Sequence, residues 1–196
     1  MGKRYEVRLS GEGGQGLILA GVILAEAAAI YDDKNAIQTQ SYGPEARGGA
    51  CKSEVIISED DIDYPKATHI DLLLALTQEA CDRYAGELRK EGILIVDSFA
   101  VERIPEDQFN VFRFPIIETA RDKIGKTIVA NIVALGAIVA LSGIVSLGAM
   151  EKALMARVPK GTEDLNHRAL IAGFEMAAKA KEGLEARFSP GREGGV

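Results

Sequence analysis

The sequence predicts a single α/β domain, in which a mostly parallel β-sheet is flanked by helices and the C-terminal third is helical. A glycine-rich turn joins an early strand to an apolar helix, which is the opening of a β-α-β unit. Two nearly continuous apolar runs, 69–76 and 92–98, have the composition of parallel strands that are covered on both faces. Beyond residue 126 the apolar pattern is helical.

Strands are expected where apolar residues alternate or run continuously between turn residues. The segment 50–58 is an alternating case, because Cys51, Ser53, Val55 and Ile57 fall on one side of an extended chain. The predicted strands are 3–10, 34–39, 50–58, 69–76, 92–98 and 111–114.

Helices are expected at 17–30, 78–90, 126–141, 146–157 and 163–187. Thr77 and Thr162 directly precede two of them, where a threonine oxygen can accept a hydrogen bond from a first-turn N–H. The glycine-rich end, 189–196, is expected to be a mobile tail, so the predicted domain spans 1–188.

The charge balance argues against nucleic acid as a partner. The 196 residues include 23 Lys and Arg and 29 Asp and Glu, which gives a net charge of −6. A nucleic-acid-binding domain is usually basic, with its cations clustered on one face.

One uncharged run, 128–145, reaches the lower edge of transmembrane length. It contains Asn131, Ser142 and two glycines and has no aromatic residues at its ends, so a helix buried in the domain or at a subunit interface fits better than a membrane span. A homodimer through Ile128–Val145 is one possible use of this helix.

The two cysteines, Cys51 and Cys81, are 30 residues apart and form no Cys-x-x-Cys pair. An iron–sulfur cluster usually needs four thiolates, so local motifs predict no cluster or metal on this chain. Unpaired cysteines and a start without an apolar export signal indicate a reducing, cytoplasmic location.

The turn Gly11-Glu12-Gly13-Gly14-Gln15-Gly16 matches the pattern G-x-G-x-x-G between a strand and a helix. Such a turn can bring backbone N–H groups to an anion. Glu12 would repel a pyrophosphate, and the second strand ends in Gln40-Ser41 without an acid for a ribose, so a dinucleotide is disfavoured. Another phosphate-bearing group, contact with a partner's active site, or a turn that only packs the helix remain open.

A second loop follows the second predicted strand and contains Tyr42, Glu45, Arg47, Gly48 and Gly49. In open parallel sheets, ligands bind beyond the carboxyl ends of the strands. Arg47 between small residues can present two N–H groups to a carboxylate or phosphate. The alternative is an ordinary surface pair between Arg47 and Glu45.

These two loops, in this order and spacing, resemble the gamma subunit of 2-oxoacid:ferredoxin (acceptor) oxidoreductases. Asp60-Asp61-Ile62-Asp63-Tyr64-Pro65 and the apolar helix with Asn131 support the resemblance, which covers roughly residues 3–185. It implies a Rossmann-like subunit of a cytoplasmic enzyme that converts a 2-oxoacid and coenzyme A to an acyl-coenzyme A and CO2, with ferredoxin as electron acceptor. We expect 2-oxoglutarate as the substrate, followed by pyruvate and branched-chain 2-oxoacids.

The resemblance also implies where the cofactors and partners lie. Thiamine diphosphate and the iron–sulfur clusters belong to alpha, beta and possibly ferredoxin-like delta subunits, and this chain helps to form or cover the coenzyme A or thiamine site without being active alone. The matching motif positions are Gly11, Glu12, Gly13, Gly14, Gln15, Gly16, Tyr42, Glu45, Arg47 and Gly48. No catalytic residue is carried over, and His69 and His167 are expected to be structural. A free-standing nucleotide-binding oxidoreductase and a ligand-free assembly subunit are the alternatives.

Overall fold

A six-stranded mixed sheet forms the centre of the protein, in the order β2-β3-β1-β4-β5-β6. The computed structural model describes residues 4–41, 50–105 and 109–188. Its strands are β1 (Tyr5–Glu12), β2 (Asn35–Ser41), β3 (Ala50–Ser58), β4 (Ile70–Ala75), β5 (Leu88–Asp97) and β6 (Asn110–Phe114). The neighbours β1, β4, β5 and β6 are parallel, whereas β3 is antiparallel to both β1 and β2. The predicted mostly parallel sheet is therefore confirmed, with β3 inserted between the first two strands.

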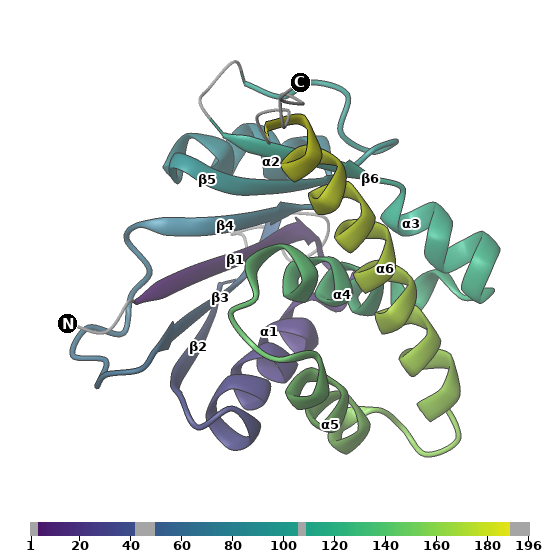
Figure 1. Cartoon of the computed structure of the whole chain (residues 1–196), viewed down its shortest axis with the longest axis horizontal. Helices are drawn as coiled ribbons and strands as arrows, with labels where there is room; N and C mark the ends of the chain where they lie inside the picture. Colours follow the sequence, from purple (N-terminus) through teal and green to yellow (C-terminus); the bar gives the residue numbers. More distant parts are fainter. Residues whose placement is uncertain (1–3, 42–49, 106–108, 189–196) are drawn as a thin grey trace, which may run out of the picture.

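Helices cover the two faces of the sheet unequally (Figure 1). They are α1 (Leu17–Glu26) with the π-helical turn η1 (Ala27–Tyr31), α2 (Gln78–Tyr84) with the 3-10 turn η2 (Ala85–Glu87), α3 (Ile116–Glu118) with the π-helical turn η3 (Thr119–Ile124), the 3-10 turn η4 (Thr127–Val129), α4 (Ala130–Ser142), α5 (Leu147–Arg157) and α6 (Glu163–Phe188). The larger hydrophobic cluster joins α1, α4, α5 and α6 to one face, and the smaller one joins α2 to the other. The C-terminal third is helical, as predicted.

The uncharged run 128–145 forms η4 and α4, and it is buried as predicted. Within the residues that the structure describes, no helix is long and apolar enough to cross a membrane. Of the large hydrophobic side chains in this run, only Ile128 is strongly exposed, at 79%. A homodimer through Ile128–Val145 would therefore have little of this helix to bury, and it stays a hypothesis.

Glycines let α4 and α6 approach backbone to backbone. A Cβ atom on Gly136 would lie 2.1 Å from the carbonyl oxygen of Leu170, and one on Gly173 would lie 1.9 Å from that of Val133. Both distances are far inside van der Waals contact, so any larger residue would push the two helices apart.

Most predicted elements are confirmed, but the segment 78–90 is not one helix. It is helical only to Glu87, and β5 begins at Leu88 rather than at residue 92. Leu88 pairs with Ile70 and packs in the smaller cluster, so burial of its side chain prevails over the helical propensity of its neighbours. The short helix α3–η3 was not predicted, because it fits between Pro115 and Gly125 and is too short for a clear apolar period. The expected tail, 189–196, lies outside the described residues.

Candidate functional site

The carboxyl ends of the parallel strands form one edge of the sheet. The chain leaves β1 towards α1 on one face and leaves β4 towards α2 on the other face. The backbone N–H of Leu76, directly after β4, donates to the carbonyl oxygen of Ser10 near the end of β1 at 3.0 Å. This reversal between neighbouring parallel strands is the position at which open α/β sheets bind ligands.

The glycine-rich turn between β1 and α1, residues 11–16, is called the glycine loop below, and Gln15 holds it closed. The backbone N–H of Glu12 donates to the Gln15 side-chain Oε1 at 2.8 Å, and the Gln15 N–H donates to the Glu12 carbonyl at 3.3 Å. A Cβ atom on Gly11 would lie 2.2 Å from that Oε1, so the fold of the loop requires glycine there. Gly14 and Gly16 have φ of 97° and 72°, which glycine adopts without strain. Gly16 is also the residue from which α1 begins.

Asn131, in the first turn of α4, fastens this loop to the helical layer. Its Nδ2 donates to the Gly16 carbonyl at 3.0 Å, and a Cβ atom on Gly16 would lie 2.6 Å from that nitrogen. The side-chain Oδ1 of Asn131 is buried and has no hydrogen-bond partner among the described residues. Buried polar atoms are nearly always paired, so this oxygen is a candidate acceptor for a bound ligand. The sequence marked Asn131 only as a polar residue in an apolar helix.

A cavity of about 330 Å³ lies beside the loop. Its lining is mainly apolar, and none of the described residues that form it has an ionisable side chain. The residues that line it are Gly14, Gly16, Leu19, Ile128, Val129, Asn131, Ile132, Val158, Pro159, Thr162, Leu165 and Asn166. Such a cavity suits the uncharged part of a ligand that carries a few hydrogen-bonding groups.

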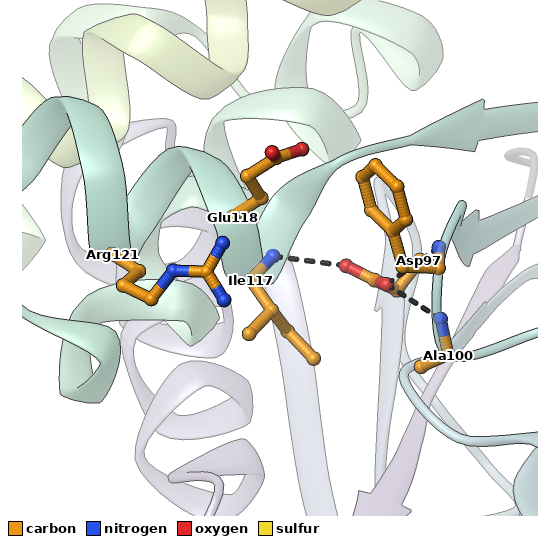
Figure 2. A pocket seen from close by; sticks show the side chains of 6 residues that line it. Asp97, Ala100, Ile117, Glu118 and Arg121 are labelled. Carbon is orange, nitrogen blue, oxygen red and sulfur yellow. Dashed lines mark hydrogen bonds between the residues drawn. The ribbon is translucent and has the colours of Figure 1, made fainter.

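A second, open cleft of about 360 Å³ lies at the ends of β5 and β6 (Figure 2). Asp97, the last residue of β5, is 1% exposed and accepts three backbone hydrogen bonds. Its Oδ1 accepts from Phe99 and Ala100 at 3.0 and 2.9 Å, and its Oδ2 accepts from Ile117 at 2.9 Å. Sequence reasoning treated this aspartate only as the end of a strand.

The second predicted loop lies largely outside the described residues, with Tyr42, Glu45, Arg47, Gly48 and Gly49. The described residues on either side of it, Ser41 and Ala50, lie at the same sheet edge as the glycine loop, because Ala50 pairs with Glu12 and Ser41 with Lys52. The structure thus brings the flanks of the two predicted loops together.

The remaining sequence candidates, two cysteines and two histidines, do not line either of these cavities. Within the described residues, no group of three or more His, Cys, Asp or Glu side chains could hold a metal ion. Burial raises the pKa of the Cys51 and Cys81 thiols, which lowers their reactivity. His69 Nδ1 contacts the Thr68 hydroxyl at 3.0 Å and His167 Nε2 contacts Glu151 at 2.9 Å.

The chain is similar to known proteins along nearly its whole length. The family model described as pyruvate ferredoxin/flavodoxin oxidoreductase matches residues 6–176. The 2-oxoglutarate synthase subunit KorC of Methanocaldococcus jannaschii is 52% identical over 176 residues, which are 89% of this chain and 94% of that protein. The gamma subunit of keto/oxoacid ferredoxin oxidoreductase from Geobacter sulfurreducens has a TM-score of 0.85 and 57% identity, covering 91% of this chain and 98% of that chain.

A third protein shares the fold as part of a longer chain. It is the 2-oxoglutarate:ferredoxin oxidoreductase from Magnetococcus marinus, solved with 2-oxoglutarate, coenzyme A and succinyl-CoA bound. The TM-score is 0.76 at 23% identity, and the match covers 91% of this chain but 31% of that chain.

Proposed function

Because this chain belongs to the pyruvate ferredoxin/flavodoxin oxidoreductase family and is a gamma subunit of a 2-oxoacid:ferredoxin oxidoreductase, we propose that it forms part of the coenzyme A site of a 2-oxoglutarate-oxidising complex. In that reaction the bond between the keto carbon and the carboxylate breaks and a thioester bond forms. A 2-oxoacid and coenzyme A yield an acyl-coenzyme A, CO2 and one proton, and two electrons pass to ferredoxin. Thiamine diphosphate and the iron–sulfur clusters would lie on the alpha, beta and any ferredoxin-like delta subunits.

The observation that carries the proposal is the unpaired Oδ1 of Asn131 beside an uncharged cavity. The pantetheine arm of coenzyme A is a chain of methylene groups interrupted by two amides. An amide N–H of this arm can donate to Asn131, and the methylene groups can pack against apolar side chains such as Leu19 and Ile128. The methylene groups of the arm therefore match the apolar lining of the cavity, and its amides match the unpaired Oδ1 of Asn131.

The start of α1 offers a place for the phosphates of the same ligand. The first intrahelical hydrogen bond runs from the Ala20 N–H to the Gly16 carbonyl, and the amides before Ala20 are those that a helix leaves without an intrahelical partner. Helix N-termini bind phosphate through such amides. Glu12 is exposed at the end of β1, and its carboxylate would repel an anion. The phosphates would therefore lie towards Gly14 and Gly16.

The contribution of Tyr42, Glu45, Arg47 and Gly48 is inferred from the family resemblance and from the chemistry of these side chains. Arg47 would bind a phosphate or carboxylate as a two-pronged donor. We expect Arg47→Ala to raise the KM for coenzyme A while the complex still assembles.

The first test is whether the complex needs this chain. The alpha and beta subunits are assayed for 2-oxoglutarate-dependent ferredoxin reduction with and without it, and the chain is also assayed alone. We expect activity only in the complete mixture. Full activity without this chain would disprove the proposed role.

A pair of Asn131 variants tests the cavity. Both variants lose the Asn131 amide N–H that donates to Gly16, but Asn131→Leu also loses the acceptor oxygen, whereas Asn131→Asp keeps one. Because burial favours the neutral acid, whose O–H can donate to Gly16, the aspartate can replace both interactions. We expect Asn131→Leu to raise the KM for coenzyme A roughly 2- to 10-fold, which is the effect of one neutral hydrogen bond, and Asn131→Asp to raise it less.

The control is Asn110→Ala, because Asn110 lies at the opposite edge of the sheet and its side chain donates to the Glu91 carbonyl at 2.7 Å, away from the cavity. Its KM for coenzyme A should match that of the wild type. Equal KM values for wild type and Asn131→Leu would remove the cavity from the coenzyme A site without affecting the need for the subunit.

A further inference from the structure

The open cleft at the ends of β5 and β6 has walls that are fixed to each other. One wall is the turn after β5 and the other is the start of α3–η3 (Figure 2). The buried Asp97 carboxylate accepts N–H groups from Phe99 and Ala100 in the first wall and from Ile117 in the second. Because one buried group holds both walls, the cleft is formed before anything binds to it.

The cleft presents an apolar surface and a net negative charge, since Asp97 and Glu118 line it together with the single cation Arg121 among the described residues. The Phe99 side chain is 68% exposed at its rim. Among the described residues the Glu118 carboxylate makes no direct hydrogen bond, and its charge interacts with the Arg121 guanidinium one helical turn away. The same guanidinium donates to Asp122 at 2.6 and 3.0 Å, so two carboxylates share one cation. A segment with an apolar side chain next to a lysine or arginine complements this surface.

We propose that this cleft is a docking site for a partner subunit of the oxidoreductase complex, through a segment that carries an apolar residue beside a basic one. The inference rests on the proposed function, since it takes the partner from that complex. The same fold makes up 31% of the longer Magnetococcus chain, so in that protein further polypeptide accompanies it. The cleft also lies at the same carboxyl edge as the glycine loop, where a partner that completes the coenzyme A site has to approach.

The role of Phe99 follows from how the binding energy is distributed over the residues of a protein–protein interface. Exposed aromatic side chains that become fully buried on association contribute most of the binding energy, and a charge at the rim sets the rate and salt dependence of association. A single exposed hydrophobic residue is ordinary on a protein surface, but here it adjoins a preformed cleft with a net negative charge.

The test measures the affinity of the full chain for its own alpha and beta subunits. Titration with fluorescently labelled chain gives the Kd for wild type, Phe99→Ala, Glu118→Lys and Glu118→Gln. We expect Phe99→Ala and Glu118→Lys each to raise the Kd at least about tenfold. Glu118→Gln should have a smaller effect at high salt than at low salt, because it removes only a charge interaction.

Controls come from the opposite edge of the sheet. Val111 is 39% exposed in β6, and Glu59 is exposed just after β3. Val111→Ser and Glu59→Lys match the loss of apolar surface and the reversal of charge, and both should bind the partner subunits like the wild type. Circular dichroism of all variants shows that the fold is retained.

Three results would overturn the proposal. The cleft variants could bind the alpha and beta subunits as tightly as the wild type does. They could instead keep this affinity and raise the KM for coenzyme A or 2-oxoglutarate, which would make the cleft a small-molecule site. Phe99→Ala could also dissociate a dimer of the chain alone and leave partner binding unchanged, which would make the occupant a second copy.

The proposed function and the docking site fail in different experiments. Wild-type chain that binds its partners without restoring activity would refute the proposed function, while the Kd values of the variants still test the docking site.

Discussion

At the scale of single residues, Asp97 and Asn131 each join two segments that are distant in the sequence. Asp97 ties the end of β5 to the start of α3, and Asn131 ties the glycine loop to α4. Neither was predicted as a site residue, because an aspartate after a strand and an asparagine in an apolar helix have many ordinary explanations. The glycine loop was predicted because its spacing is a local pattern. The partners of Asp97 and Asn131 are set by tertiary structure, which no local pattern reports.

Tyr5 provides a pH test of the buried sheet. Burial, with a smaller contribution from the Asp71 carboxylate, raises the pKa of Tyr5 from 10.0 to about 12. Between pH 10 and 12 the unfolded chain releases this proton while the folded chain keeps it, so stability falls as pH rises. We expect wild type to lose on the order of 2–3 kcal/mol relative to Tyr5→Phe across this window, measured by urea denaturation. An unchanged difference between the two proteins would show that the phenol ionises normally in the fold.

At the scale of elements, buried strands and long helices were predictable, and their boundaries and order were not. The runs that became β4 and most of β5 are apolar enough to identify a strand that is covered on both faces. The early start of β5 depends on the pairing of Leu88 with Ile70, which is a long-range contact. The insertion of β3 between β2 and β1 could not be predicted from the sequence either, because an alternating pattern identifies a strand but not the strands that pair with it.

The crossing of α4 and α6 leads to a prediction about stability. We expect Gly136→Ala and Gly173→Ala each to lower the free energy of unfolding by about 3 kcal/mol, because the added methyl group has no room between the helices. Gly148→Ala in α5 is the matched control, since a Cβ atom there meets nothing within 4 Å. It should raise the free energy of unfolding by up to about 1 kcal/mol, as alanine is the better helix former. The free energies of unfolding of the three variants are measured by urea denaturation. Equal free energies for all three would contradict the close packing of α4 and α6.

At the scale of the whole molecule, the sheet is most protected at its centre. Every residue of β4 is buried and both of its neighbours are parallel strands, whereas β2 is an edge strand whose residues are partly or fully exposed. We expect amides in Leu72–Ala75 to exchange with deuterium only on global unfolding, and those of β2 to exchange through local opening at lower free energy. Native-state hydrogen exchange measures both. Equal protection of β2 and β4 would contradict this order.

The central place of β1 also has a consequence for how the protein is made. Strand β1, which precedes the other five in the sequence, pairs with Ala50–Ile57 on one side and with Leu72–Ala75 on the other. Both of its ladders can therefore close only after Ala75 has been synthesised, and its apolar side chains stay uncovered until then. The glycine loop takes its shape later still, because Asn131 must be synthesised before it can bond to Gly16. The candidate site is thus completed only after all six strands of the described sheet have been synthesised.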